Sequence, residues 1–269
     1  MIRSHRWFSL AVIVTIALGI GVNTTVFTLV NAVLFKPLDL PGGDRLLSIR
    51  NHNLTEEHSR FGMSYPEFTA YKRDNQTFES LEAIASASIV MSEPGNPPER
   101  VNEARVSDGF LGMVKAQPVL GRNFDHDDHL PGATAVAIIG YDLWQTRYGG
   151  DASIIASQVT IDGESNTIIG VMPKGFKFPR NQAMWRPLEK NEESLDFSNR
   201  PLDLYGIRKR GVSKKMATRD LELIAQRLAE DHSDTNESIR PVPMTFHEEG
   251  NGGNIRVVFL TMLVQRGGK

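Results

Sequence analysis

The sequence predicts an α+β extracytoplasmic domain of two subdomains, preceded by one transmembrane α-helix. Three observations lead to this fold class. A long segment near the N-terminus, from Trp7 to Phe35, contains no charged residue. After residue 36, candidate strands and helices interleave without the regular alternation of a doubly wound sheet. Finally, 40% hydrophobic and 23% charged residues are ordinary values for a globular chain.

Composition excludes several classes of function. Lys and Arg total 30, Asp and Glu total 32, and the net charge of −2 lacks the basic surplus of nucleic-acid-binding proteins. The absence of cysteine rules out a disulfide framework, a Cys-ligated metal site and a Cys nucleophile. The sequence also lacks the Walker-type nucleotide motif and the Gly-x-Ser-x-Gly elbow of hydrolases. We therefore expect no bound cofactor.

The uncharged segment Trp7–Phe35 predicts a membrane-spanning helix. At 1.5 Å per residue it covers about 44 Å, enough for the hydrocarbon core and both headgroup layers of a bilayer. A cleaved signal peptide with Leu10–Val22 as its core is the alternative, but Asn23-Thr24-Thr25 offers no Ala-x-Ala cleavage site. We expect residues 1–6 to stay in the cytoplasm and everything after Lys36 to lie outside, because large domains cross largely regardless of charge.

One face of this predicted helix suits packing against another membrane helix. Gly21, Thr24, Thr28 and Asn31 recur at helical spacing, and small or hydroxylated residues allow two helices to approach closely. Asn31 is the most informative member, because a lone amide facing lipid is costly. The alternative is that the threonines bond only to their own backbone carbonyls.

Local patterns predict the strands of the soluble domain, which we place at residues 36–250. Short apolar or alternating runs predict strands at Arg45–Arg50, Ala83–Val90, Glu99–Val106, Thr134–Ile139, Val159–Ile161, Asn166–Val171 and Arg240–Phe246. Pro94–Pro98 is expected to be a turn, and Asp162-Gly163 is a typical dipeptide of a two-residue hairpin.

Three helices are also expected. One begins at Ser64, where Ser64, Pro66 and Glu67 form the capping pattern of a helix start. We expect Tyr65, Phe68 and Tyr71 to form the buried face of this helix. A short helix is expected at Tyr141–Tyr148.

The strongest helical pattern of the soluble part is Ser213–His232, with Ser213 as its cap. We expect Met216, Ile224 and Leu228 on one face of this helix, with Leu221 and Ala225 beside them.

Three polar clusters are candidate metal, catalytic or anion-binding sites. Asp125-His126-Asp127-Asp128-His129 has metal-ligand residue types but lacks the spacing of a known loop, so a solvated acidic loop is the favoured interpretation over a metal site. His247-Glu248-Glu249 lacks the second histidine of a zinc protease. A basic cluster around Gly211 is expected to be an exposed turn, with an anionic partner as the alternative; it comprises Arg208, Lys209, Arg210, Lys214 and Lys215.

Many short motifs follow one another in order from about Leu10 to about Phe246. They are Ala17–Leu34, Lys36-Pro37-Leu38, Pro41–Leu46, Ser64–Phe68, Phe78–Leu81, Gln117–Arg122, Trp144, Tyr148–Asp151, Ile169–Pro173, Phe178-Pro179 and Trp185–Leu188. With these motifs the chain resembles MacB/FtsX-like ABC transporter permeases. In two places the chain departs from the family, which usually has glycine where Lys115 and Ala156 stand.

The resemblance implies a permease subunit of an ABC-type export or mechanotransmission system, and not an enzyme. It implies that ATP is bound by a separate ATPase subunit, whose hydrolysis moves the periplasmic core domain. It further implies a permease homo- or heterodimer in the lipid bilayer of the bacterial inner membrane, a periplasmic adaptor as partner, and no nucleic acid.

The C-terminal end departs from the family pattern. Residues 251–269 look like the truncated start of a second transmembrane segment, because the apolar run Val257–Val264 is too short to cross a bilayer. One alternative function is a single-pass, membrane-anchored binding module without transport activity. Another is an enzyme that uses the Asp125–His129 cluster.

Overall fold

The computed structural model describes residues 13–21, 24, 42–56, 59–190, 195–245 and 248. The chain divides into two units, Leu40–Thr245 and the two flanking segments Met1–Asp39 with Phe246–Lys269. In the flanking unit, residues 13–21 are helical. No helix within the described residues is both long and apolar enough to cross a membrane. Much of the predicted helix Trp7–Phe35, and all of 1–6 and 251–269, lie outside the described residues.

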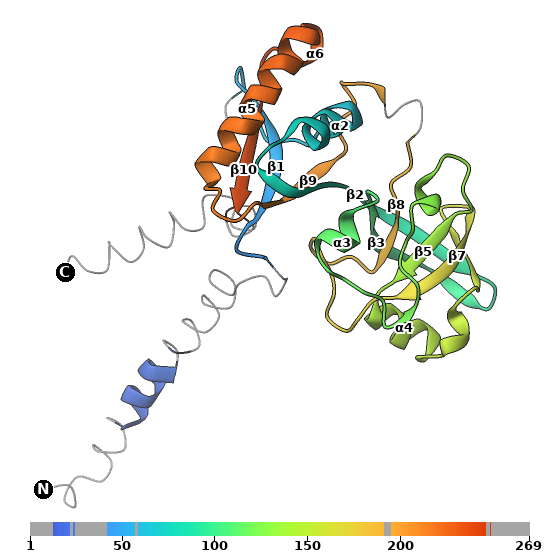
Figure 1. The fold of residues 1–269 in the computed structure, drawn as a ribbon. Helices are drawn as coiled ribbons and strands as arrows, with labels where there is room; N and C mark the ends of the chain where they lie inside the picture. Colours follow the sequence, from blue (N-terminus) through green and yellow to red (C-terminus); the bar gives the residue numbers. More distant parts are fainter. Residues whose placement is uncertain are drawn as a thin grey trace, which may run out of the picture. The chain divides into compact units, whose positions relative to one another are not determined.

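The unit Leu40–Thr245 is built on one ten-stranded mixed sheet (Figure 1). Its strands are β1 (Leu46–Asn53), β2 (Phe78–Glu93), β3 (Asn96–Val106), β4 (Leu120–Gly121), β5 (Val136–Ile139), β6 (Gln158–Ile161), β7 (Glu164–Val171), β8 (Met184–Pro187), β9 (Asp203–Arg208) and β10 (Ile239–Thr245). The strand order is β10-β1-β9-β2-β3-β8-β5-β7-β4, with β6 paired to β2 and β7. Only β3–β8 and β5–β7 are parallel among these pairs.

Five helices accompany the sheet within the described residues. They are α2 (Tyr65–Asp74), α3 (Phe110–Met113), α4 (Tyr141–Tyr148), α5 (Lys214–Asp231) and α6 (Ser233–Asn236). Short 3₁₀ turns occur at Asp127–His129 and Ala152–Ile154. This mixed α/β architecture fits the α+β class that the sequence predicts.

Two hydrophobic clusters lie against the one sheet, where the sequence led us to expect two subdomains. The first core packs α2 and α5 on β1, β9 and the start of β2, with Leu47, Tyr71 and Leu221 fully buried. The second core packs α4 on β5, β6, β7 and the end of β2. Leu81 on β2 belongs to the first core and Met91 on the same strand to the second, so this long strand joins them (Figure 1).

Local capping signals are confirmed. The Ser64 hydroxyl accepts a hydrogen bond from the backbone N–H of Glu67, and the Glu67 carboxylate accepts one from the N–H of Ser64. Ser213 caps α5 by accepting from the N–H of Met216. The prediction that Met216 shares one face with Ile224 and Leu228 is wrong, since those two side chains are buried and Met216 is 55% exposed. At about 100° per residue, Met216 lies roughly 120° from the centre of the buried arc, which Ala217 occupies instead.

Two turn predictions have different outcomes. The hairpin β6–β7 turns at Asp162-Gly163, and both residues have the positive φ that a type I′ turn requires. The predicted turn Pro94–Pro98 is too long, because β3 already begins at Asn96. Lys115 and Ala156, where the family resemblance implies glycine, both adopt positive φ (52° and 69°), so the backbone is left-handed there without glycine.

Candidate functional site

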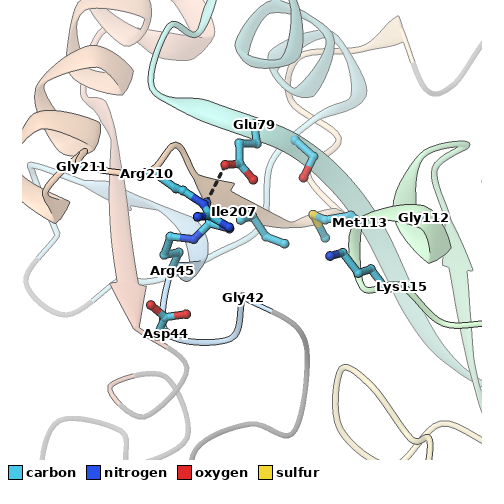
Figure 2. A pocket seen from close by; sticks show the side chains of 11 residues that line it. Gly42, Asp44, Arg45, Glu79, Gly112, Met113, Lys115, Ile207, Arg210 and Gly211 are labelled. Atoms are coloured by element: carbon cyan, nitrogen blue, oxygen red, sulfur yellow. Dashed lines mark hydrogen bonds and ion pairs between the residues drawn. The ribbon is translucent and has the colours of Figure 1, made fainter.

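A cavity of about 690 Å³ lies where the chain enters the domain (Figure 2). We call it the Arg45 cavity. Four segments line it: the turn before β1, the start of β2, the α3 segment, and the end of β9 with the turn after it. The lining residues are Gly42, Asp44, Arg45, Glu79, Ser80, Gly112, Met113, Lys115, Ile207, Arg210 and Gly211.

Arg45 is held firmly at the wall of this cavity. Its Nη1 donates to Oε1 of Glu79 (2.7 Å) and to the backbone carbonyl of Arg208. The same hydrogen bond, together with the charges of Arg45, Arg210 and Lys115, holds the pKa of the Glu79 carboxyl below its usual range despite slight desolvation. Glu79 is therefore ionised at neutral pH, and Arg45 is the cation that it neutralises most directly.

The other two cations of the cavity have no such partner. Within the described residues, neither the Lys115 ammonium nor the Arg210 guanidinium has a hydrogen bond or ion pair. Figure 2 shows Lys115 on the α3 side and Arg210 beside Arg45, so cations from separate elements border one cavity. The arrangement can accept an anion.

The predicted basic cluster is only partly assembled here. Arg210 lines the Arg45 cavity, but Arg208 donates to the carbonyls of Val212 and Asp44, and Lys209 donates to that of Gln76. Sequence reasoning missed Arg45, Glu79 and Lys115, which are far from the cluster in sequence. The one available signal was Lys115 itself, because the family resemblance implies glycine at this position.

A second cavity of about 340 Å³ borders the middle of β2, where this strand passes from the first core to the second. Its wall includes Ser86, Ser88, Glu103 and Arg105. Behind it, the buried Glu103 accepts hydrogen bonds from Nε (2.6 Å) and Nη2 (3.0 Å) of Arg186. This ion pair joins β8 to β3 beside the second cavity.

The Asp125–His129 cluster is an internally bonded loop. Both Nη atoms of Arg122 donate to the Asp128 carboxylate, and His126 Nδ1 lies 2.9 Å from Asp108 Oδ2. Across the described residues no group of three His, Asp or Glu side chains could hold a metal ion. The metal-site and enzyme alternatives therefore gain no geometric support from this loop.

The predicted helix-packing face is only partly described. Gly21 and Thr24 are helical and exposed, whereas Thr28 and Asn31 lie outside the described residues. Several apolar side chains of the same helical segment, including Ile13, Leu18 and Ile20, are also exposed. Of His247-Glu248-Glu249, only Glu248 is described.

Residues 9–226 match the family described as the MacB-like periplasmic core domain. No curated protein matches the sequence closely enough to count as a relative.

Among the solved structures that are similar to the chain are three domains of membrane transport proteins. A domain assigned to a permease protein from Porphyromonas gingivalis has 18% identity and a TM-score of 0.60, covering 77% of this chain and 93% of that one. The extracellular domain of the noncanonic ABC-type transporter YknZ from Gram-positive bacteria has 17% identity and a TM-score of 0.55, with 72% and 99% covered. The periplasmic region of MacB from Actinobacillus actinomycetemcomitans has 12% identity and a TM-score of 0.58, with 79% and 94% covered. At these identities the likeness shows a shared fold.

Proposed function

Because the chain belongs to the MacB-like periplasmic core domain family, a family of ABC transporter permease components, we propose that it is a permease subunit. Its extracytoplasmic domain is moved by ATP hydrolysis in a separate ATPase, and the chain does no covalent chemistry itself. The first transmembrane helix is Trp7–Phe35, with residues 1–6 in the cytoplasm and the domain outside the inner membrane.

The observation that carries this proposal is the pairing of the first and last strands of the domain. β1 and β10 are antiparallel neighbours, and Leu47 near the start of β1 is opposite Thr245 at the end of β10. The chain therefore enters and leaves the domain at the same end of one strand pair. A domain inserted between two membrane segments needs this connection, because both segments must reach the same membrane surface.

The sheet offers a route for movement from this strand pair to the rest of the domain. β1 pairs with β9, β9 pairs with β2, and β2 extends into the second core. Backbone hydrogen bonds make such a ladder stiff, so a displacement of the flanking segments would pass through β1 and β10 together and tilt the rest of the sheet. Spatial continuity of this kind supports coupling, and the coupling itself must be measured.

The absence of cysteine allows a direct test of movement. Spin labels at Met216→Cys on α5 and Val119→Cys beside β4 report on the two cores, and both positions are exposed. In the native membrane complex, adding ATP and vanadate should shift the distance distribution between these labels. A pair confined to the first-core side, Met216→Cys with Leu54→Cys, should stay unchanged. An unchanged distance for both pairs would favour the membrane-anchored binding module instead.

Topology can be tested with the same cysteine-free background. A membrane-impermeant maleimide should label Val119→Cys in intact spheroplasts, and should label Ser4→Cys only after lysis. Labelling of Ser4→Cys in intact cells would contradict the proposed orientation.

Partner packing is proposed for the face formed by Gly21, Thr24, Thr28 and Asn31, which would contact a second permease copy or another permease helix. Replacing all four by leucine should abolish co-purification with the ATPase and permease partners. Leucine at Val22, Val26 and Val33 on the opposite face is the matched control and should leave co-purification intact. Equal association of both variants would refute the packing face.

A further inference from the structure

We propose that the Arg45 cavity binds the phosphate of an anionic phospholipid headgroup. The assignment rests on its charge. Three cations line the cavity, Arg45, Lys115 and Arg210, against the two carboxylates Asp44 and Glu79. Among the residues that the structure describes, Arg45 alone forms an ion pair with a carboxylate of the cavity, at 2.7 Å from Glu79. Lys115 and Arg210 are thus available to a bound anion.

The way in which Lys115 is positioned supports a ligand role. Its backbone has a φ of 52°, a left-handed conformation that side chains other than glycine adopt at an energetic cost. Lys115 comes after Val114, the C-cap residue of α3, and Figure 2 shows its side chain across the cavity from Arg45 and Arg210. A phosphate between them would meet cations from two sides, which is the usual pattern of a phosphate-binding pocket.

The shape of the cavity allows a headgroup to approach the backbone. Gly112 and Gly211 lie on its wall, and a Cβ added to either would meet no atom within 4 Å. The volume of about 690 Å³ is far larger than a single phosphate needs. A glycerol-linked headgroup would use this space better than inorganic phosphate.

The place of the cavity in the chain favours a lipid as the source of the phosphate, a step that rests on the proposed function. Gly42 and Arg45 are among the first residues of the domain, and only residues 36–41 separate Gly42 from the predicted membrane helix. Fully extended, these six residues span about 20 Å. A connection of this length allows the cavity to meet headgroup phosphates of the outer leaflet, and basic residues close to a membrane attract anionic lipids.

The experiment uses the full-length chain in neutral detergent, probed with short-chain phosphatidylglycerol, short-chain phosphatidylcholine and inorganic phosphate. Binding is followed by native mass spectrometry and by thermal shift. We expect phosphatidylglycerol to bind more tightly than phosphatidylcholine. The double variant Lys115→Gln/Arg210→Gln should weaken phosphatidylglycerol binding roughly 10- to 30-fold, as expected for the loss of two cations.

Two further variants sharpen the test. Lys174→Gln/Arg219→Gln removes two exposed cations elsewhere, and phosphatidylglycerol affinity should stay within about twofold of wild type. Glu79→Gln removes the carboxylate that competes for Arg45, so it should tighten phosphatidylglycerol binding several-fold.

The outcomes separate cleanly. Equal binding of phosphatidylglycerol by wild type and by Lys115→Gln/Arg210→Gln overturns the proposal. Inorganic phosphate binding as tightly as phosphatidylglycerol, with the same loss in the double variant, overturns the lipid source. Because these measurements need neither ATPase nor transport, an unchanged spin-label distance with intact lipid binding would count against the proposed function alone.

Discussion

The two cores of the domain are assembled from different parts of the chain. The first core combines residues Leu47–Ala83 with Leu202–Leu228, so it closes only when the two ends of the domain meet. The second core lies within the single stretch Ile89–Met184. Closing contacts across such a long separation costs more chain entropy. The difference teaches that the stretch forming the second core is an insertion between the two stretches that form the first core. The first core is therefore the part attached to both flanking segments.

Each core region contains a buried carboxylate, and their partners differ. Beside the second core, Glu103 is 0% exposed and paired with the Arg186 guanidinium. In the first-core region, the Glu67 carboxylate accepts hydrogen bonds from Asn51 (3.1 Å) and Asn236 (2.7 Å), and Arg200 donates to it at 3.3 Å. These Glu67 partners come from β1, α6 and the segment before β9, so Glu67 joins the same distant pieces that the first core does.

The largest expected effect comes from breaking the buried ion pair. Arg186→Met leaves Glu103 charged and buried without its main partner, and should lower the free energy of unfolding by about 3–5 kcal/mol. Urea denaturation measures the loss. Arg105→Gln, which removes a half-exposed contact at 3.2 Å to the same carboxylate, is the control and should cost less than about 1 kcal/mol. Equal losses would mean that Arg186 is not the principal partner.

A smaller effect is expected from the first-core carboxylate. Glu67→Gln keeps the shape of the side chain but weakens hydrogen bonds to a charged group, and should cost about 1.5–3 kcal/mol. Hydrogen exchange should show lost protection in β1 and α6 with little change in β5 and β7. Arg73→Gln at the exposed end of α2 should change stability by less than about 0.5 kcal/mol. Uniform loss of protection would show that the two cores unfold as one.

Two histidines should change the folding stability in opposite directions as the pH falls. Burial lowers the pKa of His129, near Asp108, Asp128 and Glu82, whose charges oppose the shift. The imidazole of His129 therefore binds a proton more readily in the unfolded chain than in the folded one. Neutral His129 thus contributes to folding stability above the unfolded pKa of about 6.5, and this contribution is lost on acidification. The hydrogen bond to Asp108 raises the pKa of His126. Protonated His126 therefore contributes to folding stability in acid, and this contribution is lost as the pH rises.

Unfolding of single variants at pH 5 and pH 8 separates these contributions. His129→Gln should be less sensitive to acid than wild type. His126→Gln should lose more stability relative to wild type at pH 5 than at pH 8. Identical pH profiles for both variants and wild type would exclude this loop as an acid-sensitive element of the domain.

The smallest effect is a gain in stability. Ala156 holds a φ of 69°, and Ala156→Gly relieves this left-handed strain, so stability should rise by about 0.5–1 kcal/mol. Ala152→Gly, in the adjacent 3₁₀ turn, should lose about as much, since glycine there only adds unfolded-chain entropy. Thermal unfolding distinguishes the two, and a loss for Ala156→Gly would contradict the strain argument.

Local chemistry made much of the fold predictable. The Ser64–Glu67 capping box, the Ser213 cap, the Asp162-Gly163 hairpin and the bounds Tyr141–Tyr148 all follow from neighbours in sequence, and the structure has each of them. The sequence was less informative about which side chains face the core, because that depends on how a helix packs against the sheet. The prediction for Met216 failed because apolar character alone does not say which arc of a helix meets the core.

The sequence by itself determined the family, the capped helices and the hairpin, because these depend on short-range backbone chemistry and on ordered motifs. Tertiary structure alone decided the pairing of β1 with β10 and the merging of all strands into one sheet. It also decided the Arg45 cavity, which gathers Arg45, Glu79, Lys115 and Arg210 from four distant segments. Such convergence leaves no local pattern, since it arises from long-range strand pairing whose energy is shared over the whole sheet.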